Sequence, residues 1–273
     1  GLATQLSGHA VLANNIDASG TAQWNGGEGF NPIGTFDTMF TGSLNGAGFG
    51  IDGLTINRSG LDNVGLFGVT LGATISNIGL DRVDINGGAQ TGGLVGDSRT
   101  SVITGSYVTG AVQGTGTVGG LVGWNTGDVS YSYSTSAVSG GETAGGLTGM
   151  NDGNVSYSYA TGAVSGSAAV GGLAGFSYGS ITQSYATGVV TGSGVNQAGL
   201  VGVNFGDITE SFWDSFTTGQ ATAIGTDTTN VQVVGEVSGD WNAPGVSAYQ
   251  AANYAGFDFS SSGAWFIAEG SSR

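Results

Sequence analysis

Clustered carboxylates are the side chains with which this sequence could most readily do chemistry. Asp207, Glu210 and Asp214 lie close together in the chain, and two carboxyl groups can act as acid and base, or as acid and nucleophile, on a glycosidic bond. Strand alternation places Asp207 at a turn, in one column with Asp128 and Asn154, which suits a carboxylate that caps turn amides. These three residues are therefore a catalytic set only under the alternative that the protein is an enzyme, and we expect that it is not.

Other catalytic and cofactor sites are disfavoured by composition. His9 is the single histidine, and the chain has neither cysteine nor lysine, which excludes zinc sites with two histidines, thiolate sites and a lysine nucleophile. A Ser-His-Asp triad would depend on His9. Residues 114–119 match the dinucleotide pattern Gly-x-Gly-x-x-Gly, but no helix is predicted to follow them. We expect no cofactor.

One segment approaches a calcium-binding loop. Residues 26–34 read Gly-Gly-Glu-Gly-Phe-Asn-Pro-Ile-Gly, in which Glu28 and Asn31 are weak calcium ligands. Calcium needs six to eight oxygen ligands, and such nonapeptides supply them only when several copies stack. A single copy predicts an ordinary loop.

The charge balance restricts the partners. The chain has 19 acidic residues against four arginines, a net charge of −15. Arg58, Arg82, Arg99 and Arg273 are scattered, whereas nucleic acids and anionic membranes select clustered basic residues. The sequence also has no apolar run long enough to span a bilayer and no signal-peptide pattern at its start. We expect no nucleic-acid partner, no membrane insertion, and export only as part of a longer precursor.

The elements that must position any site are set by an internal repeat. Anchor leucines recur in steps of 28, 27, 26, 26 and 27 residues. These are Leu66, Leu94, Leu121, Leu147, Leu173 and Leu200. A second column keeps the same period, with a serine before each aromatic residue: Tyr107, Tyr133, Tyr159, Tyr185 and Phe212. Two columns with one period indicate a repeat architecture.

The repeat predicts an all-β fold, a parallel β-solenoid with about 26–28 residues per coil. Short apolar segments alternate with turn signals, and the unit is too short for a propeller blade and lacks a helix. We expect irregular opening coils and a cap in residues 1–63, the repeat solenoid in 64–214, and aromatic-rich closing coils and a cap in 215–273, all in one continuous domain. Residues 246–254 are predicted to form a short helix.

Each repeat position has an expected role. The anchor leucines, with Val129, Val155, Ile181 and Ile208, are predicted to fill the core. The glycines two residues after each leucine are predicted to mark a bend, and Asn125 and its equivalents to stack as a polar ladder that caps turn amides. The tyrosine column is predicted to be an internal stack. The tail aromatics are predicted to cover the end of the core.

Two aromatic residues are candidates for contact with a ligand. Trp124 and Phe176 share one column with Met150 and Val203, and this mixture of residue types indicates a partly exposed position. Sugars stack on exposed aromatic rings. A row of threonines, one per coil, leaves an ice-binding face as a weaker alternative.

The repeat unit resembles a known family. Gly-Gly-Leu-x-Gly, an Asn and Gly turn, Ser-Tyr-Ala-Thr-Gly and Val-x-Gly, as in residues 145–166 and 171–192, are similar to the GLUG repeat of large bacterial surface proteins. Residues 40–46, 54–58 and 64–68, with Ser211-Phe-Trp-Asp and residues 265–273, resemble filamentous-haemagglutinin-like exoproteins of two-partner secretion. The resemblance implies a right-handed β-helix in an exported adhesin.

These observations together favour a non-catalytic segment of a secreted or cell-surface bacterial adhesin associated with the outer membrane. It would act as a rigid stalk or present a binding surface. Its expected partners are a receptor or glycan on a host or neighbouring cell and the rest of a longer exoprotein. The alternative is a β-helix that binds glycans, or cleaves polysaccharides with its surface carboxylates.

Overall fold

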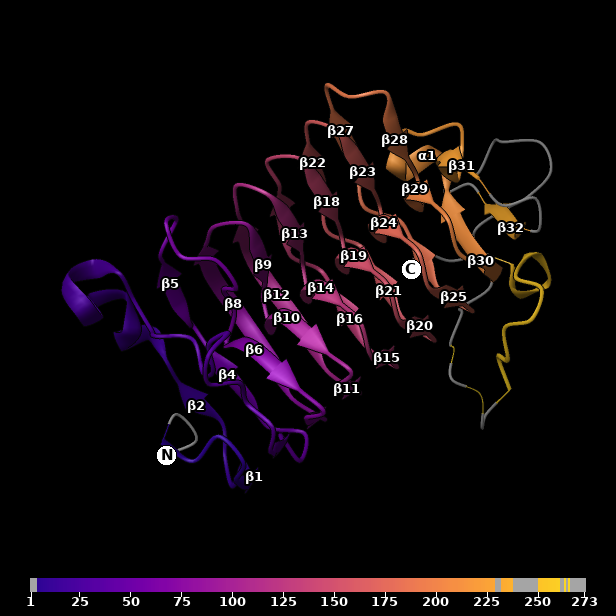
Figure 1. Cartoon of the computed structure of the whole chain (residues 1–273). Coiled ribbons are helices and arrows are strands. Elements are labelled where there is room, and N and C mark those ends of the chain that lie inside the picture. Colours follow the sequence, from indigo (N-terminus) through magenta and orange to yellow (C-terminus); the bar gives the residue numbers. More distant parts are fainter. Residues whose placement is uncertain (1–3, 229–231, 238–249, 261–262, 264, 266–273) are drawn as a thin grey trace.

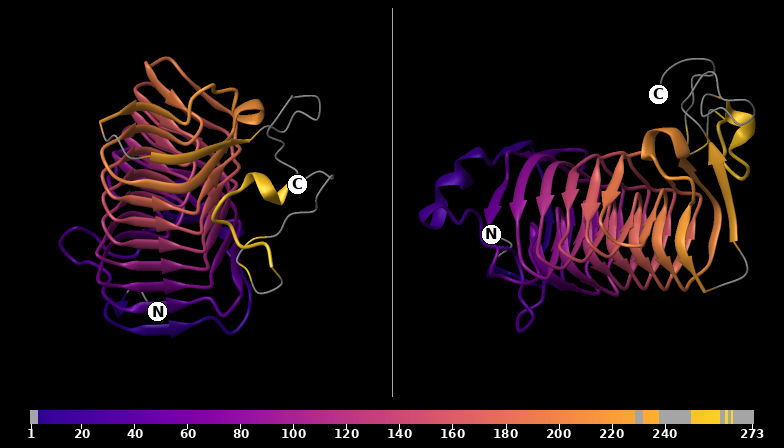
Figure 2. Two further views of the ribbon diagram at one scale, coloured as in Figure 1. Left: turned by 90° about the vertical axis from the view of Figure 1, so that its right-hand side faces the viewer. Right: turned by 90° about the horizontal axis from the view of Figure 1, so that it is seen from above.

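The chain winds into a β-solenoid whose coils stack along one axis (Figures 1 and 2). The computed structural model describes residues 4–228, 232–237, 250–260, 263 and 265. Its ladders are parallel, and sheet B keeps one register from coil to coil, as in Val95 beside Val122 and Val122 beside Thr148. The seven strands of one ladder correspond to seven coils. The predicted all-β parallel solenoid is confirmed.

The strands form three sheets. Sheet A has twenty strands: β1 (His9–Val11), β2 (Ile16–Asp17), β3 (Ser43–Asn45), β4 (Gly50–Asp52), β5 (Thr55–Asn57), β7 (Thr74–Ser76), β8 (Gly79–Asn86), β11 (Val102–Thr104), β12 (Tyr107–Gln113), β15 (Asp128–Ser130), β16 (Tyr133–Ser134), β17 (Ala137–Ser139), β20 (Asn154–Ser156), β21 (Tyr159–Ala160), β22 (Val164–Gly166), β25 (Ser180–Thr182), β26 (Tyr185–Ala186), β27 (Val190–Gly192), β30 (Ile208–Asp214) and β32 (Gln232–Val237). Sheet B has seven: β6 (Phe67–Leu71), β10 (Val95–Arg99), β14 (Val122–Asn125), β19 (Thr148–Asn151), β24 (Ala174–Ser177), β29 (Val201–Asn204) and β31 (Ile224–Asp227). Sheet C has five: β9 (Gln90–Gly92), β13 (Thr117–Gly119), β18 (Thr143–Gly145), β23 (Ala169–Gly171) and β28 (Asn196–Ala198).

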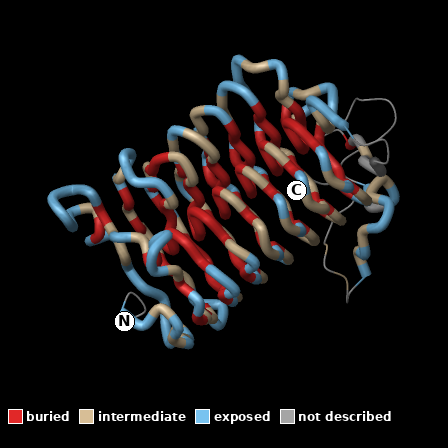
Figure 3. Tube along the Cα trace, in the orientation of Figure 1, coloured by how far each residue is buried: buried red, intermediate tan, exposed pale blue. Residues whose placement is uncertain are grey.

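Each repeat runs from sheet B through sheet A and sheet C to the next strand of sheet B. Strand β14 of sheet B leads through a turn into β15, β16 and β17 of sheet A, and β18 of sheet C leads back to the next sheet B strand, β19. Buried residues line the inside of these strands, and exposed residues concentrate in the turns (Figure 3). The six anchor leucines are 0–4% exposed. Opposite them, Val129, Val155, Ile181 and Ile208 are 0–1% exposed.

The glycines two residues after the anchor leucines do not mark a bend, so that prediction is wrong. Gly123, Gly149 and Gly175 lie inside strands of sheet B, and their φ angles are not in the left-handed region. A Cβ atom on Gly123 would lie 2.5 Å from the carbonyl oxygen of Gly96 and 2.8 Å from the amide nitrogen of Thr91. Glycine is therefore required by the close approach of neighbouring backbones.

Two buried polar ladders run along the solenoid. In the first, Asn125 Nδ2 donates to Asn151 Oδ1 at 2.9 Å, and Asn151 Nδ2 donates to Ser177 Oγ at 3.3 Å. In the second, the backbone N–H of each column serine donates to the hydroxyl of the serine in the next coil, as from Ser132 to Ser158 at 3.2 Å. These bonds satisfy buried polar groups that would otherwise cost about 1 to 3 kcal/mol each.

The opening coils pair in parallel with the repeat coils that follow. Strand β3 pairs with β7, and β4 with β8. The 3-10 segment η2 (Ser19–Gly27) lies at this end, and Leu12, Ala18 and Phe30 pack against the core (Figure 1).

The C-terminal region adds one coil and then folds back along the outside. After the short helix α1 (Ser215–Thr218), β31 pairs with β29 and β32 pairs with β30. The tail aromatics Tyr254 and Phe257 then pack against Phe212, on the outside of sheet A. These two aromatics therefore do not cover the end of the core as predicted, whereas Trp241, Tyr249 and Phe266 of the same prediction lie outside the described residues. Of the helix predicted over 246–254, residues 246–249 lie outside the described ranges, and the rest contains the 3-10 turn η3 (Ala251–Asn253).

Candidate functional site

A column of four tyrosines lies on the outer face of sheet A. The rings of Tyr107, Tyr133, Tyr159 and Tyr185 stack with centroids 4.8–4.9 Å apart and planes within 5° of parallel. All four are half-buried, so the predicted internal stack is wrong. Stacking turns the ring faces toward one another and leaves the ring edges outward. We call these four residues the tyrosine column.

The tyrosines face outward because of the corner that precedes them. Val129 points into the core, and strict alternation would also direct Tyr131 and Tyr133 inward. Tyr131 instead takes φ 49°, and its equivalents in the next coils, Tyr157 and Gln183, take φ 49° and 46°. This left-handed residue shifts the alternation by one position, so the serine that follows it is buried and the column tyrosine faces outward.

The environment of the tyrosine column disfavours ionisation. Burial raises the pKa of Tyr107 to about 12, and its hydroxyl also donates a hydrogen bond to Asp81 at 2.9 Å. Burial likewise raises the pKa of Tyr159 to about 12 and raises the pKa of Tyr133. These phenols are neutral at physiological pH and are not bases.

The tail covers the C-terminal half of the tyrosine column. The Trp265 ring lies 6.3 Å from Tyr159 and 5.3 Å from Tyr185, at angles of 57° and 59°. The indole plane is thus tilted against both tyrosine rings, which avoids the unfavourable face-to-face sandwich of aromatic quadrupoles. This part of the column is an intramolecular packing surface.

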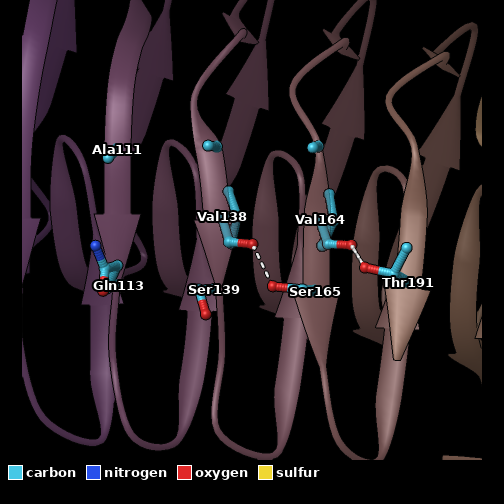
Figure 4. Close-up of a pocket in the computed structure, with 9 residues that line it drawn as sticks. Ala111, Gln113, Val138, Ser139, Val164, Ser165 and Thr191 are labelled. Carbon is cyan, nitrogen blue, oxygen red and sulfur yellow. Dashed lines mark hydrogen bonds between the residues drawn. The ribbon is translucent and has the colours of Figure 1, made fainter. Parts of the chain in front are cut away.

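Beside the tyrosine column lies a shallow floor of small side chains. Ala111, Ala137 and Ala163 line it with Ser165 and Thr191, in a depression of about 250 Å³ (Figure 4). The Ser165 hydroxyl donates to the Val138 carbonyl at 3.3 Å, and the Thr191 hydroxyl donates to the Val164 carbonyl at 3.4 Å. The lining contains no acid, base or nucleophile set.

The candidate catalytic carboxylates do not converge. Asp214 is fully buried and caps α1, accepting hydrogen bonds from the amides of Phe216 and Thr217 at 3.0 and 3.3 Å. Asp207 is exposed at a turn, and Glu210 is exposed at the corner with φ 47°. Asp214 is thus committed to a structural role, and the arrangement provides no paired acid and base.

Among the other candidate residues, Glu28 and His9 are engaged in local contacts. Glu28 forms an ion pair with Arg58 at 2.8 Å, and Asn31 is exposed. His9 Nδ1 shares a hydrogen bond of 2.8 Å with Ser43 Oγ across strands β1 and β3. Within the described residues no group of three or more His, Cys, Asp or Glu side chains is placed to hold a metal ion.

Trp124 and Phe176 lie on sheet B, where both are half-buried. Strand pairing places Trp124 beside Met150, Met150 beside Phe176, and Phe176 beside Val203. The Trp124 indole N–H donates to Asp152 Oδ2 at 2.8 Å, which fixes the orientation of its ring. Phe176 instead borders a patch in which Tyr178 stacks on Phe205 at 4.7 Å.

The residues on the other side of Trp124 were not predicted from the sequence. Asp97 pairs with Trp124 in the sheet B register and is 3% exposed. Arg99 bonds Asp97 Oδ2 through Nε at 2.9 Å and Nη2 at 2.8 Å. With Thr126, these residues line a surface depression of about 300 Å³. The sequence signal that could have identified them is Asp97, an acidic residue at a repeat position that is otherwise mostly apolar.

Three comparisons place the chain among known proteins. Residues 166–191 match the family described as the GLUG motif. Halomucin from Haloquadratum walsbyi (strain DSM 16790 / HBSQ001) is 42% identical over 118 residues, which cover 41% of this chain and 1% of Halomucin. A crystal structure assigned as an immunoglobulin A1 protease from Bacteroides ovatus matches with a TM-score of 0.60 and 20% identity, over 84% of this chain and 77% of that one.

The comparisons agree with the internal repeat. The GLUG match falls on one repeat, and the same unit recurs in the neighbouring coils. The chain spans about 1% of the length of the curated relative it matches. The likeness to the Bacteroides ovatus structure shows a shared fold. Within the described ranges, no helix has the length and apolarity needed to cross a bilayer.

Proposed function

We propose that this chain is a non-catalytic, structural segment of a secreted or cell-surface adhesin, in which it acts as a rigid stalk and presents a binding surface. The observation that carries the proposal is the unbroken sheet B ladder, in which seven parallel strands stack from β6 to β31. Side-chain columns run parallel to this ladder, with the Asn125–Asn151 column in the core and the Tyr133–Tyr159 column on the outer face of sheet A. Such stacking gives a stiff rod whose outer rows present side chains at regular intervals.

The surface composition supports an extracellular role. The lysine-free chain carries a net charge of −15, which keeps an exposed rod soluble and discourages adsorption to anionic surfaces. The GLUG match and the similarity to Halomucin support membership in a longer surface protein. Export by a filamentous-haemagglutinin-like two-partner route, association with a bacterial outer membrane, and binding to a host or neighbouring-cell receptor or glycan belong to the same proposal.

The geometry favours neither a polysaccharide hydrolase nor a serine hydrolase. Polysaccharide cleavage by Asp207, Glu210 and Asp214 would require the buried cap Asp214 to leave its helix. The His9–Ser43 pair lies on the surface, and no described carboxylate contacts His9 to orient its ring. A Ser-His pair needs that third group and an oxyanion site for efficient acyl transfer. The fold likeness to a protein assigned as a protease does not supply them.

The proposal is tested by incubating the purified chain with neutral and acidic polysaccharides and measuring both retention on each polymer and new reducing ends. Retention without cleavage is the expected result. The control is the double variant Asp207→Asn/Glu210→Gln, which alters only exposed carboxylates. Cleavage that the control abolishes would overturn the non-catalytic assignment. A folded chain that no polymer retains would contradict the adhesive part, and a non-cooperative thermal transition would contradict the rigid stalk.

A further inference from the structure

The sheet B column that contains Trp124 is interrupted by a charge. Strand pairing gives the order Val69, Asp97, Trp124, Met150, Phe176, Val203 and Thr226. Only one of these seven residues is ionisable, and it is 3% exposed. Burial of a carboxylate is unfavourable unless the charge is paired. The neighbouring coils fill this position without a charge, so the stacking itself does not require Asp97.

The Asp97–Arg99 pair lines the depression and has two polar atoms without a described hydrogen-bond partner. Both Arg99 hydrogen bonds fall on Asp97 Oδ2. No described group bonds Asp97 Oδ1 or Arg99 Nη1. An acceptor and a charged donor are therefore fixed on one side of the depression. A ligand group that both donates and accepts hydrogen bonds would satisfy them.

The surrounding side chains hold this pair in place. The Arg99 guanidinium lies 4.6 Å from the centroid of the Phe36 ring, in a cation–π contact. Trp124 also lines the depression and is anchored through its N–H to Asp152. The Thr126 hydroxyl accepts a hydrogen bond from the Thr100 amide at 3.1 Å and donates one to the Ser98 carbonyl at 3.3 Å. The depression thus has an immobilised aromatic wall and an immobilised donor–acceptor pair.

We infer that this depression, which we call the Trp124 site, binds a neutral pyranose ring through two adjacent hydroxyl groups. One hydroxyl donates to Asp97 Oδ1, the other accepts from Arg99 Nη1, and the C–H face of the sugar packs on Trp124. Its volume of about 300 Å³ is at the small end of ligand sites. A neutral sugar is favoured because the Arg99 charge is already paired and the chain carries −15 overall. The inference rests on the proposed adhesive role and names its ligand class.

The test compares immobilised dextran with dextran that has been oxidised by periodate and reduced with borohydride. This treatment cleaves the bond between adjacent hydroxyl-bearing carbons and destroys the pyranose diols. The full chain should be retained by the first polymer and not by the second. Trp124→Ala removes the stacking surface and Asp97→Asn removes the charge of the acceptor, so each should weaken retention about tenfold or more.

The controls separate the Trp124 site from the proposed function. Tyr178→Ala removes an exposed ring from the same face outside the depression and should leave retention unchanged. Asp97→Asn conserves size and an acceptor for Arg99, and equal melting temperatures would establish that it folds. Dextran retention that is equal in Trp124→Ala and the unaltered chain would overturn the Trp124 site and leave the adhesive proposal standing. Undiminished retention on the oxidised polymer, or no retention on dextran, would overturn the inference itself.

Discussion

Gly146 and Ala160 face each other across the core, and a Cβ atom on Gly146 would lie 2.7 Å from the Cβ atom of Ala160. The same relationship recurs in neighbouring coils, where Gly120 faces Ser134 and Gly172 faces Ala186. The second glycine of each Gly-Gly-Leu motif therefore sets the distance between the two faces of the solenoid. Real Cβ atoms do not approach this closely, so a larger residue must push the faces apart.

Gly146→Ala should lower the free energy of unfolding by about 3 kcal/mol, the upper part of the usual range for overpacking. The added methyl group would clash with the Gly172 carbonyl oxygen as well as with Ala160. Guanidinium unfolding followed by circular dichroism measures the change. Gly60→Ala is the matched control, since nothing lies within 4 Å of its Cβ position, and it should change stability by less than about 0.5 kcal/mol. Equal effects of the two substitutions would show that the faces are not in contact at Gly146.

Asn151→Ala should lower the free energy of unfolding by about 2 kcal/mol, because it leaves buried partners without hydrogen bonds. Asn151 accepts from Asn125 at 2.9 Å and donates to the Gly153 carbonyl at 3.1 Å. Asn154→Ala removes an exposed amide that donates to Asp128 at 2.8 Å and should cost less than about 0.5 kcal/mol. Thermal unfolding of both variants distinguishes the contribution of the buried Asn125–Asn151 ladder from that of the exposed Asn154–Asp128 hydrogen bond. Similar costs would contradict a special role for the buried ladder.

The tyrosine column should make stability fall at high pH. The pKa values of Tyr107 and Tyr159 are raised from 10.0 to about 12 in the folded chain. Below pH 10 both states are protonated, and the stabilisation from these groups is fully present. Between pH 10 and 12 only the unfolded state loses these protons, so stability decreases as pH rises. Phenolate absorbance should therefore appear later in the folded chain than in denaturant, and coincident titrations would contradict the burial of the column.

Arg82→Gln should lower the melting temperature at low salt, and the deficit should shrink in 1 M NaCl. Strand pairing stacks Asp17, Asp52 and Asp81 in consecutive coils, and Arg82 pairs with Asp52. Loss of the Arg82 charge increases the repulsion among the three neighbouring carboxylates. Salt screens this repulsion, so the deficit should shrink as salt is added. Arg58→Gln is the control, because its partner Glu28 is not part of such a column. A deficit that persists undiminished in 1 M NaCl would show that packing, not charge, explains the effect.

The repeat made the core predictable. Residues that recur at a constant step are placed above one another by parallel strand pairing, so each column has a single environment. The anchor leucines and the Asn125–Asn151 ladder could therefore be assigned from spacing alone, and they are buried in the structure.

The corner before the tyrosine column could not be assigned in this way. Non-glycine residues seldom adopt positive φ, and Tyr131, Tyr157, Gln183 and Glu210 carry no local signal that they do. Only Gly105 and Asn77, which occupy the same column with φ 58° and 52°, hinted at the turn. One unrecognised left-handed residue per coil was enough to reverse the expected direction of every tyrosine.

The sequence by itself determined the all-β solenoid, its period and its core columns, because these depend on a local pattern repeated at a fixed step. The tertiary structure decided the outward direction of the tyrosine column, the separation of Asp214 from Asp207 and Glu210, and the convergence of Asp97 and Arg99 with Trp124. These relationships depend on corner conformation and on side chains from adjacent coils, which lie far apart in the chain and meet only when the coils stack.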